Sequence, residues 1–320
     1  MGNNMPLTLA GMTITGGMTF VDEAAAGPTQ QAIFGYGELA DGSYTALTNL
    51  VSNTGVVATD TTGVGTARVG LGGATYGIDK AIFGYGESSS AYTAVTNLVS
   101  NAGVVATDTT GVGTARQATA AAGYGTNKAI FGYGYNGSYL SLTNLVSNTG
   151  VVASDTAGVG TVRDKLAAAG YGTDKAIFGY GETSIDFQSV TNLVSNTGVV
   201  ATDTTGVGTI RSYLAAAGYG TDKAIFGYGE AASIYSITNL VSNTGVVATN
   251  TTGVGTARSR LAAAGYGGDK AIFGYGTTNY LNSGSVSTTN KVSNTGVVAS
   301  NTTGVGTARV RLAAAGFSLT

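Results

Sequence analysis

Short runs of hydrophobic residues separated by polar turns cover most of the chain. Val, Ile, Tyr, Phe and Ala gather in runs of about five residues, and each run ends at a turn rich in Gly, Asn, Asp or Ser. Runs of this length are typical of β-strands and too short for most helices. The pattern therefore predicts an all-β protein.

The runs recur with a fixed period. The segment AIFGYG begins at Ala32, Ala81, Ala129, Ala176, Ala224 and Ala271, so successive starts lie 47 to 49 residues apart. Each copy continues through a variable stretch into a segment like TNLVSNTGVVATDTTGVGTAR and then into LAAAGYGTDK. The repeats start near residues 31, 80, 128, 175, 223 and 270. A period of this length indicates a repeat architecture with loops that vary over a constant frame.

Each copy contains four candidate strands. In the third copy they cover residues 129–132, 140–146, 150–154 and 163–169. The run LAAAG could form a helical turn because Ala favours helices, but its small residues and the Gly that follows favour a crowded inner strand. Four short strands in about 48 residues is typical of a propeller blade. We therefore predict a six-bladed β-propeller of four-stranded antiparallel blades over residues 31–320.

The two ends of the repeat region complement each other. The first copy begins at Gln31 without a preceding LAAAGYG run, whereas the chain ends on such a run at residues 309–316 with no AIFGYG after it. Pairing of this last strand with residues 31–37 would close the ring and leave no sheet edge exposed. We expect that closure.

Residues 1–30 differ from the repeats. The segment LTLAGMTITGGMTFV alternates apolar with small or polar residues and predicts one or two strands. A lone hairpin is not stable in water, so we expect this arm to pair with another chain or a neighbouring copy and to act as an anchor. A disordered tail is the alternative. The lack of Lys and Arg in residues 1–20 argues against a secretory signal.

Composition excludes several kinds of chemistry. The chain has 52 Gly and only 10% charged residues, with no His, Cys or Trp. Thiolate and imidazole metal sites and disulfides are therefore excluded, and we expect no cofactor. A net charge of -2 argues against nucleic-acid binding, and no run approaches the roughly 18 apolar residues of a membrane helix.

A family resemblance follows from the order of residues in each copy. The segment of residues 211–230, RSYLAAAGYGTDKAIFGYGE, resembles the kelch motif of galactose-oxidase-like propellers, and the resemblance covers residues 31–320. It implies four-stranded antiparallel blades around a central axis. The copper site of galactose oxidase would require histidines and a cysteine-linked tyrosine, and this chain has neither residue type.

An arginine and an acid recur at fixed places. The arginines are Arg68, Arg116, Arg163, Arg211, Arg258 and Arg309, and the acids are Asp60, Asp108, Asp155 and Asp203. The arginines could form a ring that binds an anion, but residues shared by every blade more often serve the frame. We therefore expect each guanidinium to satisfy buried carbonyls or pair with the aspartate, bridging blades. Asn250 and Asn301 replace the acid in the last two copies, which favours a turn-stabilising role over a catalytic one.

The copies differ most just after AIFGYG. The variable stretches are residues 38–44, 87–92, 135–140, 182–187, 230–235 and 277–287. They should share one face, and their aromatic residues are candidate partner-binding positions: Tyr44, Tyr92, Tyr139, Phe187, Tyr235 and Tyr280. Such mixtures of aromatic and adaptable polar residues bind partners, although neutral drift of exposed loops is the alternative.

The repeats also resemble propeller proteins carried by tailed bacteriophages. This similarity implies a non-enzymatic structural and adhesive virion protein of the tail, baseplate or tail fibre, assembled in the host cytoplasm. Residues 1–30 would dock it on other virion proteins in a symmetric assembly, and the loops would face a partner or host surface glycan. A capsid-surface decoration protein and a lectin-like propeller are the alternatives. A glycosidase would need two unrepeated carboxylates within about 10 Å in one pocket.

Overall fold

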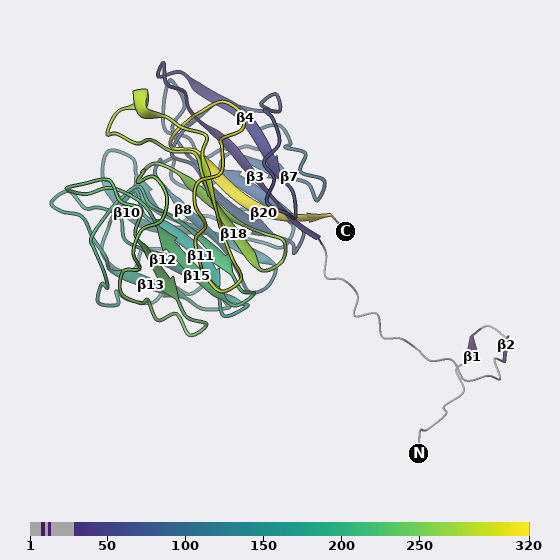
Figure 1. Ribbon diagram of the computed structural model, residues 1–320. Coiled ribbons are helices and arrows are strands. Elements are labelled where there is room, and N and C mark those ends of the chain that lie inside the picture. Colours follow the sequence, from purple (N-terminus) through teal and green to yellow (C-terminus); the bar gives the residue numbers. More distant parts are fainter. Residues whose placement is uncertain (1–7, 10–11, 14–28, 320) are drawn as a thin grey trace.

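The computed structural model of the chain describes residues 8–9, 12–13 and 29–319. These residues form an all-β structure with six antiparallel sheets of three strands each, which fits a propeller-like fold (Figure 1). A further pair joins β1 (Thr8–Leu9) to β2 (Met12–Thr13). The predicted all-β repeat is confirmed. The rest of the predicted N-terminal arm lies outside the described residues.

Each sheet has an inner, a middle and an outer strand. The inner strands are β5 (Gly72–Tyr76), β8 (Ala120–Tyr124), β11 (Ala167–Tyr171), β14 (Ala215–Tyr219), β17 (Ala262–Tyr266) and β20 (Ala313–Leu319). The middle strands are β3 (Thr29–Glu38), β6 (Lys80–Gly84), β9 (Lys128–Tyr135), β12 (Lys175–Gly179), β15 (Lys223–Gly227) and β18 (Lys270–Gly274). The outer strands are β4 (Tyr44–Val51), β7 (Thr96–Val99), β10 (Tyr139–Val146), β13 (Thr191–Val194), β16 (Thr238–Val241) and β19 (Thr289–Val292). One 3-10 turn, η1 (Asn282–Gly284), lies in the sixth variable loop.

The inner strands are the LAAAG runs, as predicted. Each inner strand contacts the inner strands of two neighbouring sheets, and the series β5, β8, β11, β14, β17, β20 returns to β5. Where the first and last members meet, the Thr75 hydroxyl donates a 2.7 Å hydrogen bond to the carbonyl of Gly316. Small residues suit this position because the neighbouring backbones approach closely.

The last strand joins the first sheet. β20 pairs with β3 from Ala313 opposite Gly35 to Leu319 opposite Thr29, and β3 pairs in turn with β4. The two strands lie side by side in Figure 1, at the purple and yellow ends of the colour bar. The predicted pairing of the C-terminal strand with residues 31–37 is therefore found. One sheet is built from both ends of the repeat region.

The prediction of four regular strands per copy was wrong in one respect. In the third copy, residues 150–154 do not form a strand, and only isolated bridges join Val152 to Val146 and Thr156 to Thr143. The segment begins at Gly150 with a φ of 84°, which departs from extended geometry. Its next acid, Asp155, directs its carboxylate to Thr114 in another part of the chain. Because of the positive φ at Gly150 and the contact of Asp155 with Thr114, isolated bridges take the place of a regular fourth strand.

The core lies between neighbouring sheets. The buried Phe of one AIFGYG strand packs on the buried Tyr of the preceding one, as in Phe131 and Tyr85, whose ring centroids are 5.1 Å apart. The same Tyr85 ring lies 4.1 Å from the guanidinium carbon of Arg116. Each hydrophobic cluster therefore contains side chains of two sheets.

No helix in the described part of the chain is long and apolar enough to cross a membrane.

Candidate functional site

The ring of inner strands has two ends that differ in their side chains. We call the end where each inner strand turns into its middle strand the turn end; it comprises residues 76–80 and their equivalents. We call the opposite end the mouth; it comprises the three residues that follow each repeated Arg and the variable loops. Each end holds a cavity, of about 330 Å³ at the turn end and about 80 Å³ at the mouth.

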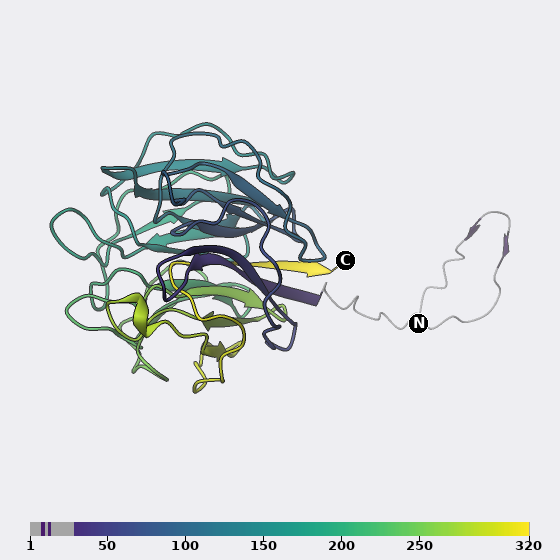
Figure 2. The same cartoon turned by 90° about the horizontal axis from the view of Figure 1, so that it is seen from above.

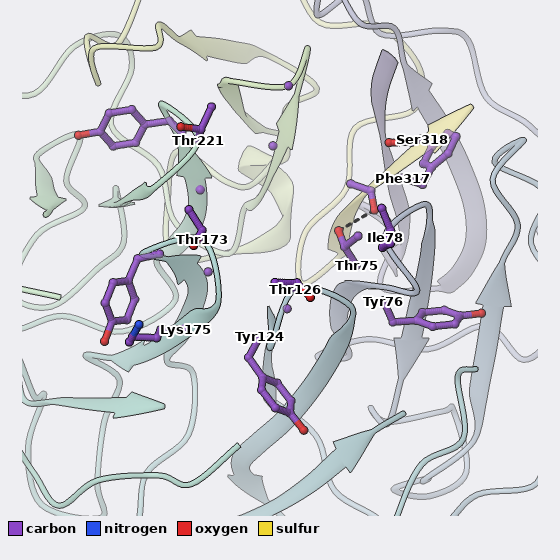
Figure 3. Close-up of a pocket in the computed structure, with 18 of the residues that line it drawn as sticks. Thr75, Tyr76, Ile78, Tyr124, Thr126, Thr173, Lys175, Thr221, Phe317 and Ser318 are labelled. Carbon is purple, nitrogen blue, oxygen red and sulfur yellow. Dashed lines mark hydrogen bonds between the residues drawn. The ribbon is translucent and has the colours of Figure 1, made fainter. Parts of the chain in front are cut away.

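The turn end is nearly the same in every copy. Threonines and glycines line its cavity, and the rings of Tyr76 and Tyr124 point away from the centre (Figure 3). The lysines before the middle strands are held by the preceding aspartates, as in Lys175 and Asp174 at 2.7 Å. Lys128 follows Asn127 and is exposed. This end therefore presents five similar turns, and in the sixth sheet the paired ends of β20 and β3 take their place.

The mouth carries unlike side chains at one repeated position. The second residue after each repeated Arg lines the mouth cavity, and these residues are Gly70, Ala118, Lys165, Tyr213, Arg260 and Arg311. The next position is Leu in every copy except the second, where it is Thr119. The six sheets thus bring unlike residues, three of them cationic, to one place.

These mouth residues share an unusual backbone conformation. All six have positive φ values, from 51° at Lys165 to 61° at Gly70. This region favours glycine, and other residues there cost about 1–3 kcal/mol each. Gly70 shows that the frame accepts glycine at this position. The side chains at the other five positions are therefore held at an energetic cost, a feature often found at functional sites.

Glutamates from the variable loops compensate the three cations. Arg311 lies 3.3 Å from a carboxylate oxygen of both Glu38 and Glu87, and it also donates to the amide oxygen of Gln117. Lys165 pairs with Glu182 at 2.5 Å. In the fifth copy Arg260 lies 3.6 Å from Glu230. Four carboxylates therefore surround three cations at the mouth.

A partly buried tyrosine, Tyr213, lies between two of the cations. The Lys165 ammonium is 4.9 Å and the Arg260 guanidinium 5.0 Å from the centroid of the Tyr213 ring. Burial raises the pKa of the Tyr213 phenol, so it stays protonated at neutral pH. Although burial alone lowers the pKa of Lys165, its neighbours Tyr213, Asp164 and Glu182 raise it above its usual range. The lysine therefore stays charged.

Asp164 lies beside this group and is almost fully buried, with 3% of its surface exposed. Burial raises the pKa of its carboxyl to about 7, with the negative charge of Glu182 adding to the effect and Lys165 opposing it. Its Oδ1 atom has no hydrogen-bond partner among the described residues. Three other buried polar atoms at the mouth, Thr119 Oγ1, Ser212 Oγ and Arg260 Nε, also lack a partner within the described ranges.

Some of the predicted loop aromatics reach the mouth. Tyr44 interacts electrostatically with Glu87 and Arg311, and burial raises its pKa. Tyr139 interacts in the same way with Asp164 and Glu182, and burial raises its pKa as well. A second tyrosine of the third copy, Tyr135, lies between two of the predicted residues, with centroids 5.3 Å from Tyr139 and 6.3 Å from Tyr92. These three rings form an aromatic cluster at the rim.

The remaining predicted aromatics contribute less to the mouth. Phe187 forms a backbone bridge with Glu182, and the Tyr235 amide bonds to Gly229. Tyr280 is 48% exposed. The long sixth loop reaches the mouth through another residue, Asn282, which donates a 2.6 Å hydrogen bond to Glu38 and accepts a 3.5 Å one from Arg260.

The repeated arginines are buried between sheets and do not line a pore. Arg68 donates to the carbonyls of Tyr85 and Thr66 and to the Asn97 amide oxygen, and its guanidinium lies 4.4 Å from the centre of the Tyr36 ring in the preceding sheet. The ring contact and the hydrogen bond to the Asn amide oxygen recur at the other five, which are also fully buried: Arg116, Arg163, Arg211, Arg258 and Arg309.

The repeated acids bind a distant threonine, whereas the sequence favoured bonds within their own turn. Asp108 accepts hydrogen bonds from the amide and hydroxyl of Thr66, which is 42 residues earlier, and from Asn97. The other three make the same contacts: Asp60 with Thr307, Asp155 with Thr114 and Asp203 with Thr161. Asn250 keeps the geometry with one bond reversed, since its amide donates to the Thr209 hydroxyl. The ring of sheets makes this partner available.

Sequence reasoning did not single out Lys165, Tyr213, Arg260 or Arg311. The signal was present, because these are the positions where six otherwise similar copies differ right after a constant Arg.

In the described part of the chain, no group of His, Cys, Asp and Glu could hold a metal ion. No family model and no curated protein matches the chain.

Proposed function

We propose that the chain is a closed six-bladed β-propeller that works as a non-enzymatic binding module, with its partner at the mouth. One observation carries this proposal: unlike charged and aromatic side chains gather at the mouth, whereas the turn end is nearly uniform. A frame needs the same residues in every copy. Residues that differ at one equivalent position, in a strained conformation, serve recognition.

The direction of β3 separates attachment from recognition. β3 begins at Thr29, which pairs with Leu319 at the turn end, and it ends at Glu38 in the mouth. The preceding chain therefore connects to the turn end, on the side where the C-terminus also lies (Figure 2). An anchor in residues 1–30 would leave the mouth facing outward. This arrangement suits an adhesive protein that is fixed at one end.

The particle we propose is a tailed-phage virion, with the tail, baseplate or tail fibre as the place of attachment. The resemblance of the repeats to phage propeller proteins supports this assignment, and the start of β3 at the end opposite the mouth agrees with it. Other virion proteins would then hold residues 1–30. A capsid-surface decoration protein would use the same polarity.

Truncation tests whether anchoring and binding use different parts of the chain. Removal of residues 1–28 should abolish incorporation into particles and leave binding by the soluble ring unchanged. Incorporation is measured by quantitative mass spectrometry of purified particles, and binding by retention on bacterial envelopes. Undiminished incorporation of the truncated chain would contradict the anchoring role.

Glycoside hydrolysis is a second candidate because carboxylates do share the mouth. Asp164 pairs across the backbone with Glu182, and its raised pKa of about 7 suits a general acid. Against it, Asp164 is only 3% exposed and Glu182 is tied to Lys165. Release of reducing ends from oligosaccharides by the wild type, and its loss in Asp164→Asn, would establish the enzyme instead.

A further inference from the structure

We propose that the mouth binds the uncharged terminal sugar of a glycan, with the ring over the rim tyrosines and one hydroxyl-bearing arm in the cavity beside Thr119. This inference rests on the proposed function and specifies its ligand. Four properties of the mouth carry it: its charge balance, the pairing of donors with acceptors, the tyrosines at its rim, and its size.

The charge balance disfavours an anionic ligand. Each of the three cations is already paired: Arg311 with two glutamates, Lys165 with Glu182 and Arg260 with Glu230. An incoming carboxylate or sulfate would find no free cation and would meet four glutamates. A neutral ligand avoids this repulsion because it brings no net charge into a partly desolvated site.

The ion pairs suit hydroxyl groups. A guanidinium offers only donors and a carboxylate only acceptors, whereas a hydroxyl can both donate and accept. Arg311 and Glu87 lie 3.3 Å apart and keep 17% and 29% of their side chains exposed, so both remain within reach of a ligand. Neighbouring sugar hydroxyls can therefore accept from Arg311 and donate to Glu87. Hydrogen bonds to charged groups of this kind are the stronger ones.

The rim supplies an apolar surface for the sugar ring. Tyr92, Tyr135 and Tyr139 form the aromatic cluster described above, and Tyr139 lies close to the Lys165 and Glu182 pair. A tyrosine ring is amphipathic, with an apolar face and a polar tip. The C–H face of a hexose can pack on such a ring while its hydroxyls reach the ion pairs.

The cavity limits what enters. It is small, at about 80 Å³ against about 330 Å³ for the cavity at the turn end. A single hydroxymethyl group suits this space better than a whole hexose. Thr119 is 93% buried and lines the cavity. Its hydroxyl has no hydrogen-bond partner among the described residues. An inserted hydroxyl would supply that partner, which explains why one copy has Thr where five have Leu.

The chain provides its own conservative test variants. Thr119→Leu places at the mouth the residue found in the other five copies, and Arg311→Gly places there the residue of the first copy, Gly70. Both substitutions are compatible with the frame. Lys175→Ala at the turn end serves as the control, because it removes a paired cation away from the mouth.

The experiment uses the full chain on a printed panel of neutral hexose oligosaccharides and of the same oligosaccharides ended by a uronic acid. We expect saturable binding to at least one neutral glycan, at least tenfold weaker binding to its uronic-acid form, and a loss of at least tenfold in Thr119→Leu and Arg311→Gly. Lys175→Ala should bind as the wild type does. Thermal unfolding of each variant verifies the fold.

Three outcomes would overturn the inference. They are equal binding by Thr119→Leu and the wild type, preference for the uronic-acid forms, or no binding to the panel by a chain that still binds bacterial envelopes after periodate has cleaved their vicinal diols. The last result would leave the proposed binding module intact. Failure to bind either glycans or envelopes would instead contradict the proposed function itself.

Discussion

The turn end and the mouth are made by the same repeat and have opposite character. Both use non-glycine residues with positive φ, such as Thr173 at 68° in a turn and Lys165 at 51° in the mouth. At the turn end this position is Thr in three of the five turns, whereas at the mouth all but the two arginines differ. The comparison teaches that this frame can carry unlike side chains at one end because the sheets are held together elsewhere.

The holding contacts lie between the sheets and not at either end. A repeated Arg, a Tyr and a Phe meet at each junction, as do Arg116, Tyr85 and Phe131. Burial raises the pKa of Tyr85 to about 12, and its hydroxyl donates to the Val112 carbonyl. Because six such junctions hold the sheets together, the varied residues of the mouth are not needed for that purpose. Substitutions at the two kinds of position should therefore differ in effect.

The largest loss of stability should come from replacing one of the repeated, buried arginines, which we call frame arginines. Arg163→Met removes the guanidinium that binds Asn192 and the Thr161 carbonyl, and we expect it to lower the free energy of unfolding by about 3–5 kcal/mol. Arg311→Met, two residues beyond a frame arginine in the last copy, should change stability far less and affect binding instead. Urea unfolding of both variants measures this. Equal destabilisation would contradict the division between frame and mouth.

The next effect concerns the turn end. A Cβ at Gly220, where φ is 59°, would lie 2.8 Å from the Asn294 carbonyl oxygen, so Gly220→Ala combines backbone strain with a clash. We expect a loss of about 2–4 kcal/mol. Gly268 is the control, because its φ is 77° but nothing lies within 4 Å of its Cβ position. Gly268→Ala should cost only about 1 kcal/mol, as measured by thermal unfolding.

The mouth should show a stability change that depends on pH. The folded pKa of Asp164 is about 7, above its ordinary 3.8, so the folded protein binds this proton more tightly and stability falls as pH rises from about 4 to 7. Lys165, Glu182 and Arg311 face the group, and the two cations stay charged in this range. Asp164→Asn should add on the order of 2 kcal/mol at pH 8 and little at pH 4. Unfolding curves at both pH values test this, and an equal gain at both would contradict it.

The smallest effect should come from a frame aspartate. Hydrogen bonds from Thr161 and Asn192 outweigh burial and hold the pKa of Asp203 below its ordinary value, so its contribution is present above about pH 4 and is lost as pH falls. Asn250 makes the same contacts in the next copy. Asp203→Asn should therefore cost less than about 1 kcal/mol at pH 7 and reduce the loss of stability in acid. A large loss at pH 7, measured by urea unfolding, would show that Asn is no substitute at this position.

Much of the fold could be predicted because its signals are local. Runs of β-branched and aromatic residues ending at Gly and Asn turns specify strands, and the unmatched first and last runs specify the pairing of β20 with β3. The segment near Val152 was mispredicted because a hydrophobic run does not show how its backbone will be paired. Its bridged form depends on Asp155 binding Thr114, which lies in another copy.

The sequence by itself determined the repeat, the strands and the variable loops, because each depends on neighbouring residues and on a period that can be counted. Only the tertiary structure decided what the loops surround. Glu38 and Arg311 are 273 residues apart, and they meet because the inner strands form a ring and one sheet contains both ends of the repeat region. Contact between such distant residues depends on how the sheets are arranged, which no local pattern records.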